Sequence, residues 1–122
     1  MKEKLRKHVI FSGGRIIDAI EAIRETRTRC VVVLEDSKVV GVISEGDIMR
    51  ALLAGSDVHS SIEGWISRDF KFLSAPRPDK ALELMHKYGI TMVPVLDASF
   101  GLQDVLTVVD ILGLAKIQGP VK

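Results

Sequence analysis

The spacing of apolar residues predicts a strand, a helix, a hairpin and a second helix in the first half of the chain. Residues 10–12 are a short β-prone run before a Gly-Gly turn. From 15 to about 28 apolar residues recur every three or four positions, as in an amphipathic helix. The runs 30–34 and 39–43 are rich in valine and flank a polar turn, which predicts a hairpin. An apolar helix is expected over 45–54.

The second half repeats this order after a connector at 59–67, which we expect to form a short helix anchored by Trp65. The expected elements are a strand at 72–74, a helix at 79–88 closed by Gly89, a hairpin of strands at 91–96 and 102–106, and a last helix at 108–117.

The two halves align with each other by a constant shift. The shift is 62 residues through the first hairpin strand and 63 after one extra residue in the second hairpin turn. The matched pairs include Ser12 with Ser74, Val33 with Val95, Ser44 with Thr107 and Asp47 with Asp110. We therefore expect two units, residues 1–66 and 67–122, packed pseudo-symmetrically in a mixed α/β (α+β) fold.

Composition narrows the class of protein. A chain of 122 residues with 47% hydrophobic and 27% charged residues has the size and balance of one globular domain. The net charge of +1 argues against nucleic acid as a partner. No apolar run approaches the roughly 20 residues of a membrane span. The single Cys30 fits a reducing compartment, so we expect a cytoplasmic protein without membrane contact.

Two strand-to-helix corners carry the candidate chemistry. Ser44 and Asp47 stand three residues apart where an apolar strand becomes an apolar helix, and Thr107 and Asp110 repeat this. Such pairs also cap helices without any ligand, and capping and binding can coexist. The sequence has no catalytic triad, phosphate loop, dinucleotide fingerprint or metal-ligand spacing, so we expect neither an enzyme nor a metal site.

The run Gly41-Val42-Ile43-Ser44-Glu45-Gly46-Asp47, with Pro94-Val95-Leu96-Asp97 in the second unit, resembles a tandem pair of CBS (cystathionine β-synthase) domains. The resemblance covers nearly the whole chain. Asp104 departs from it, because the family usually has Gly there, and Val32 stands where Pro is expected. Residues 44–53 are also similar to CBS pairs attached to sugar nucleotidyltransferases.

This resemblance implies an adenosine-containing ligand such as AMP, ADP or ATP, with no cofactor required. Asp47 would accept both ribose hydroxyls beside Ser44, and free N–H groups at the helix start would suit phosphate. Arg29 is the favoured arginine for a phosphate. By family position the adenine would contact two sets of residues, which are Thr28, Arg29, Cys30 and Val42 in one unit, and Ile90, Thr91, Met92 and Val105 in the other. Thr107 and Asp110 would form the second corner, and Ser12 and Ser74 are candidate lining residues.

The helices at 48–54 and 108–115 are apolar almost all round, so more than one side of each must be covered. We expect a homodimer, with an attached or partner enzyme as the regulated component. The function expected is a non-catalytic regulatory module that binds an adenine nucleotide. The alternative is a structural homodimerisation module whose Ser/Thr-x-x-Asp pairs are only caps.

Overall fold

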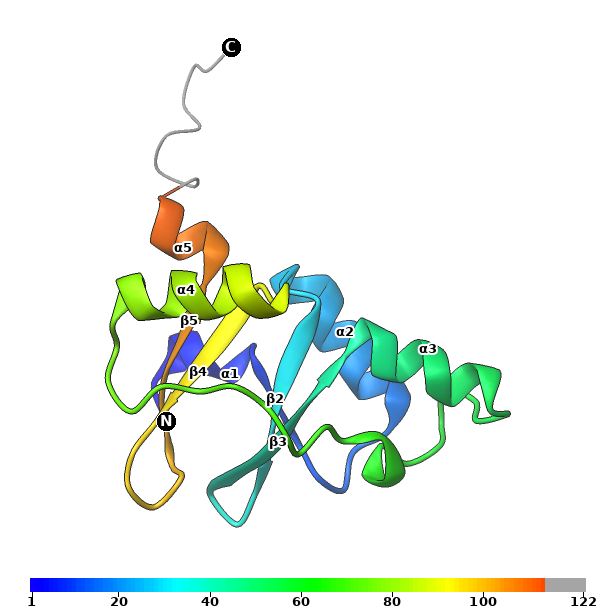
Figure 1. Ribbon diagram of the computed structural model, residues 1–122. Coiled ribbons are helices and arrows are strands. Elements are labelled where there is room, and N and C mark those ends of the chain that lie inside the picture. The colour runs from blue at the N-terminus through cyan, green and yellow to red at the C-terminus, as the bar shows by residue number, and fades with distance from the viewer. Residues whose placement is uncertain (114–122) are drawn as a thin grey trace.

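The computed structural model describes residues 1–113 (Figure 1). Its α-helices and strands follow the expected order except at the N-terminus and at residues 72–74. The elements are α1 (Glu3–Arg6), β1 (Val9–Phe11), α2 (Ile16–Thr26), β2 (Cys30–Glu35), β3 (Lys38–Ser44), α3 (Glu45–Leu53), a 3-10 turn η1 (Glu63–Trp65), α4 (Pro78–Tyr88), β4 (Met92–Leu96), β5 (Leu102–Thr107) and α5 (Val108–Leu112). No helix in this part of the chain is long and apolar enough to cross a membrane.

Both predicted hairpins and the four longer predicted helices are confirmed in place and type, and α4 ends at Gly89 with a φ of 66°. The helix α1 was not predicted. The last helix was expected to reach residue 117, whereas α5 ends at Leu112 with Gly113 in the left-handed region. Residues 114–117 of that prediction lie outside the described residues.

The predicted strand at 72–74 is wrong, since only one bridge forms there, between Leu73 and Val95. Pro94 explains the difference. In the first unit the N–H of Val32 donates to the carbonyl of His8 at 2.8 Å and so extends the pairing of β1. Pro94 occupies the matching position in β4 and has no N–H to donate, which leaves a shorter ladder on this edge.

The two hairpins share one irregularity. In the first, β2 pairs antiparallel to β3 and parallel to β1, with a register shift between Val33 and Leu34. In the second, β4 pairs with β5 and the register shifts between Val95 and Leu96, 62 residues further on. The repeated bulge supports the internal alignment, because such features bend and twist a strand at a fixed place.

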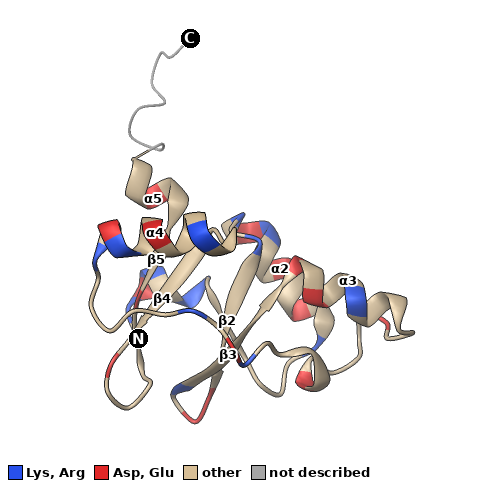
Figure 2. Cartoon of the chain, in the orientation of Figure 1, with Lys and Arg blue, Asp and Glu red and all other residues tan. Residues whose placement is uncertain are grey.

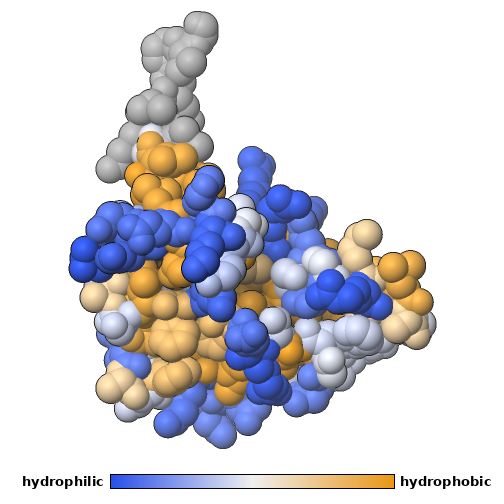
Figure 3. Space-filling view, in the orientation of Figure 1, coloured by the Kyte–Doolittle hydropathy of each residue, from blue (hydrophilic) through white to orange (hydrophobic). Residues whose placement is uncertain are grey.

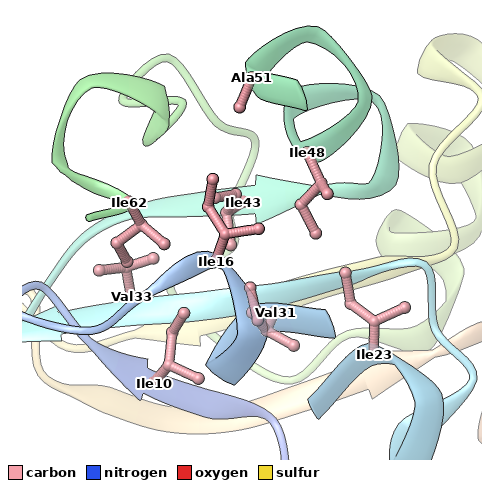
Figure 4. Close-up of a cluster of buried hydrophobic side chains, with 10 residues drawn as sticks. Ile10, Ile16, Ile23, Val31, Val33, Ile43, Ile48, Ala51 and Ile62 are labelled. Atoms are coloured by element: carbon pink, nitrogen blue, oxygen red, sulfur yellow. The ribbon is translucent and has the colours of Figure 1, made fainter. Parts of the chain in front are cut away.

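The core is divided by the alternation of side chains along β2. Val31 and Val33 point into a cluster with α2 and α3 (Figure 4), whereas Val32 and Leu34 point into a second cluster. That second cluster includes residues of both halves, among them Val39, Met92, Leu96 and Val105. A third cluster joins α4 to β4 through Ala81, Met85 and Val93. The two hairpins are thus packed face to face, with the longer helices outside.

Candidate functional site

A pocket of about 490 Å³ opens between the two halves, at the end of the sheets where β2 and β4 begin. One wall of the pocket is formed by two of the predicted segments, 28–30 and 90–92, together with the start of α3. The lining residues are Thr28, Arg29, Cys30, Val42, Ser44, Glu45, Gly46, Asp47, Arg50, Ser67, Asp69, Phe70, Lys71, Tyr88, Gly89, Ile90, Thr91, Met92 and Pro94.

The start of α3 is a complete capping box. The Ser44 hydroxyl accepts from the Asp47 N–H at 3.2 Å, and Asp47 Oδ2 accepts from the Ser44 N–H at 2.8 Å and from the Ser44 hydroxyl at 3.0 Å. The extended backbone of Ser44 ends β3 and begins α3, so the sequence order of strand, serine and helix places both side chains at the pocket.

Asp47 has less free hydrogen-bonding capacity than the sequence suggested. Its Oδ1 accepts from the guanidinium of Arg50, one turn along α3, so three of about four acceptor positions are in use. The carboxylate can take both ribose hydroxyls only if Arg50 moves away. Two N–H groups of the first turn of α3 are also in use, since the Glu45 N–H donates to the Arg29 carbonyl at 3.0 Å and the Asp47 N–H donates to the Ser44 hydroxyl.

A cross-link between the halves forms part of the pocket wall. The Thr91 hydroxyl donates to the carbonyl oxygen of Thr28, which is itself buried. Beside it, burial and secondly the Asp47 carboxylate raise the pKa of the Cys30 thiol to about 12. Cys30 is therefore a neutral, unreactive wall residue rather than a nucleophile.

Arg29 stands at the rim in an unusual conformation. Its φ of 68° lies in the left-handed region, which is uncommon for residues other than glycine. Its Nε lies 3.2 Å from Glu45 Oε1, and both side chains are largely exposed. Arg29 and Arg50 therefore both face the pocket with carboxylate partners that a ligand phosphate could replace.

The sequence interpretation missed several lining residues, among them Phe70 and Lys71 from the connector, which in the structure extends from the end of α3 to the start of α4, and Tyr88 from the end of α4. Lys71 Nζ lies 4.5 Å from the centre of the Tyr88 ring, a cation–π contact that joins the connector to α4. No local pattern marks these residues, because the connector reaches the pocket only through the packing of the two halves.

The other predicted residues lie elsewhere. Ser12 follows β1, and its N–H donates to the carbonyl of Leu34 near the end of β2. Ser74 follows Leu73, whose carbonyl accepts from the N–H of Leu96 at the end of β4. Both serines are therefore at the ends of β2 and β4 opposite to the pocket. Val105 and Thr107 are on β5 and Asp110 is on α5, outside this lining.

The corner at Thr107 differs from the corner at Ser44. The Thr107 hydroxyl accepts from the Asp110 N–H at 3.1 Å, but among the described contacts the exposed Asp110 carboxylate does not return a bond to the Thr107 backbone. Asp104 Oδ1 lies 3.7 Å from Lys4 Nζ of α1. The N-terminal segment thus approaches this corner, and the two corners are not equivalent.

Gly41 is the residue of the first unit that matches Asp104, and here a close approach of the backbone leaves no room for a side chain. A Cβ at Gly41 would lie 2.5 Å from Ile66 Cγ2 and 2.6 Å from the Ser67 carbonyl oxygen. Ser67 pairs with Val42 through two backbone hydrogen bonds of 2.8 and 3.0 Å, so the connector runs directly against β3. At the matching position 104, the Lys4 side chain lies against β5, and its ammonium group is compatible with the aspartate there.

The pocket lining carries charges of both signs in equal number. Its charged lining residues are three basic ones, Arg29, Arg50 and Lys71, and three acidic ones, Glu45, Asp47 and Asp69. Both signs occur along α3 and the connector (Figure 2). No group of three or more potential metal-ligating side chains occurs within residues 1–113. Apolar walls with a few polar groups are typical of small-molecule sites.

Comparison with known proteins gives the fold. The CBS domain family model matches residues 8–54. A 17.7 kDa protein from the bps2 3' region of Acidianus ambivalens is 24% identical over 106 residues, which are 85% of this chain and 64% of that protein. The chain therefore spans less than two thirds of that relative.

Two of the solved structures that are similar to this chain are CBS domain proteins. A CBS domain pair/ACT domain protein from Thermotoga maritima has a TM-score of 0.70 at 20% identity, over 93% of this chain and 90% of that one. A CBS domain protein from Pyrobaculum aerophilum, solved in complex with AMP, has a TM-score of 0.69 at 22% identity, over 88% and 90%. The fold of this chain is that of a CBS domain pair.

Proposed function

We propose that this protein is a non-catalytic regulatory module that binds an adenosine-containing ligand, AMP, ADP or ATP, between two repeats, residues 1–66 and 67–122. The observation that carries the proposal is the 490 Å³ pocket whose wall joins Ser44 and Asp47 to the segments 28–30 and 90–92. Its size is within the range of small-molecule sites. The AMP complex of the Pyrobaculum protein, which has the same fold, supports this class of ligand.

Each part of the ligand has a matching part of the pocket. The ribose hydroxyls bind Asp47 beside Ser44, with Arg50 displaced from the carboxylate. The adenine lies against Cys30, Val42 and Met92, which are partly or fully buried, and against the backbone of the two adjoining segments. The displaced Arg50 and the neighbouring Arg29 then bind the phosphate through charge-assisted hydrogen bonds.

We further propose that the module acts as a homodimer that alters the conformations of an attached or partner enzyme. The exposed apolar side chains of α3 and α5, among them Met49 and Leu112, support a covering molecule. A sugar nucleotidyltransferase is one candidate enzyme, because residues 44–53 resemble CBS pairs of that kind. The proposal places the protein in the cytoplasm, which suits its single Cys30.

Calorimetric and thermal-shift titrations with AMP, ADP and ATP test the proposal. We expect saturable binding and a rise in melting temperature for at least one nucleotide. Binding should be lost when Asp47 and Asp110 are both replaced by alanine. Unchanged binding in that double variant, or no stabilisation at millimolar nucleotide, would contradict the proposal.

The alternative is a structural homodimerisation module without a ligand. The complete capping box at Ser44 and Asp47 favours it, because these side chains already stabilise α3 without a nucleotide. This alternative expects Asp47→Ala to lower stability while wild type binds no nucleotide in the same titrations.

A further inference from the structure

The Tyr88 ring at the edge of the ligand pocket is covered by two ammonium groups. Tyr88 ends α4, lines the pocket and is 44% exposed. The Nζ atom of Lys71, from the connector, lies 4.5 Å from the ring centre, and Nζ of Lys87 lies 5.4 Å from it. Of these two lysines, only Lys71 is a lining residue of the pocket. A ligand in the pocket can therefore meet both Lys71 and the ring that it covers.

Lys71 is the basic lining residue whose contact is most easily exchanged. Arg29 and Arg50 each lie against a carboxylate of α3. Within the described residues 1–113 no ion pair holds Lys71, whose charged group faces the Tyr88 ring. A cation–π contact at an exposed ring is weaker than a charge-assisted hydrogen bond to a phosphate. A phosphate in the pocket thus draws Lys71 away from the ring.

The internal repeat indicates that this contact is not required by the fold. With the shift of 62 residues, Tyr88 matches Thr26 and Lys71 matches Val9. The Thr26 hydroxyl donates to the carbonyl of Ala22 in its own helix, and Val9 packs among apolar residues. The first half therefore folds with neither an aromatic ring nor a cation at these places. The contact between Lys71 and Tyr88 is a particular feature of the ligand pocket.

A nucleotide offers a new partner to each member of the contact. Its phosphate binds the Lys71 ammonium, and its planar base stacks on the Tyr88 ring that the ammonium leaves. Adenosine has no phosphate, so its base takes the ring and leaves Lys71 with water alone. On the face that Figure 3 shows, hydrophilic side chains over α4 and part of the connector border apolar ones. This surface suits a ligand with a flat apolar part and a charged part.

We propose that Lys71 and Tyr88 make the pocket selective for nucleotides over nucleosides, because Lys71 moves from the ring to the phosphate and the adenine takes its place on the ring. This inference rests on the proposed nucleotide binding. It makes Lys71 favourable for AMP and unfavourable for adenosine. Removing the charge of Lys71 should weaken AMP binding by about fivefold or more, the effect of a lost hydrogen bond to a charged group. The same change should tighten adenosine binding by about twofold or more, because the ring is then uncovered.

Isothermal titration calorimetry of the full chain with AMP and adenosine tests these opposite effects. Lys71→Gln should weaken AMP binding and tighten adenosine binding, so that the ratio of the two affinities falls by about tenfold or more. Lys87→Gln is the matched control, because Lys87 contacts the same ring without lining the pocket. Both affinities of this variant should stay within about twofold of wild type, since an exposed charge outside the pocket is screened by salt.

The Tyr88 ring can be observed separately. Tyr88 is the only tyrosine of the chain, so ring-labelled tyrosine gives NMR signals that belong to this residue alone. Bound AMP should give nuclear Overhauser contacts between its base protons and these ring protons. Tyr88→Leu should weaken AMP binding by about fivefold or more, and Tyr88→Phe, which keeps the ring, by less than about twofold.

Adenosine that binds Lys71→Gln no more tightly than wild type would overturn the exchange. Equal effects of Lys71→Gln and Lys87→Gln on AMP binding would do the same, as would bound AMP without contacts to the Tyr88 ring. Failure of the proposed function gives a different result, since wild type then binds no AMP in the same calorimetry.

Discussion

The Thr91 hydroxyl donates a hydrogen bond to the carbonyl oxygen of Thr28, and so joins the segment before β4 to the segment before β2. The two residues are 63 positions apart and belong to different halves of the chain. The bond holds together the two segments that line the pocket, so the width of the pocket depends on how closely the two halves approach each other.

Replacing Thr91 with valine keeps the shape of the side chain and removes the donor. The buried Thr28 carbonyl then loses a partner, which should cost about 1 to 3 kcal/mol of unfolding free energy. Urea denaturation measures the loss. A variant as stable as wild type would show that this bond does not hold the halves together.

The two matching aspartates should differ in their contribution to stability. Asp47 completes a capping box and is buried, so Asp47→Ala should lower the unfolding free energy by about 0.5 to 2 kcal/mol. The exposed Asp110 returns no such bond, and Asp110→Ala should change stability by less than about 0.5 kcal/mol. Equal losses in urea denaturation would contradict the difference between the two corners.

Gly41 should be far less tolerant of a methyl group than Gly64. A Cβ at Gly41 would overlap the Ser67 carbonyl and Ile66, so Gly41→Ala should cost about 1 to 3 kcal/mol. A Cβ at Gly64 meets no atom within 4 Å, which makes Gly64→Ala a matched control with little effect. Thermal unfolding of both variants checks this, and similar melting temperatures would count against the close approach of connector and β3.

His8 predicts a loss of stability in mild acid. Burial, and secondly Lys7, lower the pKa of His8 from 6.5, while Asp110 and Glu25 act in the opposite direction. Its Nδ1 has no hydrogen-bond partner among the described residues. The unfolded chain therefore binds the proton more tightly, so stability is complete above about pH 6.5 and falls below it, by at most about 1.4 kcal/mol per pH unit.

Urea denaturation between pH 7.5 and 5.5 measures this slope. His8→Phe should flatten it, whereas His86→Phe, at an exposed position of α4, should leave it as in wild type. An unchanged slope in His8→Phe would assign the acid sensitivity to other groups.

The elements were predictable where local chemistry decides them. Periodicity and the serine at the end of β3 were enough for α3, and Gly89 for the end of α4. The prediction of a strand at 72–74 was wrong because Pro94 on β4 lacks the N–H that would extend the pairing. The residues 72–74 themselves carry no sign of this, since the cause lies on the partner strand.

The site was predictable only in part, for the same reason. The repeat indicated Ser44 and Asp47, and the resemblance to CBS pairs indicated the segments 28–30 and 90–92; all of these residues line one pocket. Phe70, Lys71 and Tyr88 reach it through tertiary packing and carry no local signal. Ser12 and Ser74 aligned well with each other, yet the direction of β2 and β4 places them at the opposite strand ends.

Amide chemical shifts of the full chain, followed by NMR during titration with AMP, test the central claim most directly. The account predicts saturable shifts that concentrate at residues 28–30, 44–47 and 90–92 and leave Ser12 and Ser74 unchanged. No shifts at millimolar AMP, or shifts confined to the corner at Thr107 and Asp110, would contradict it.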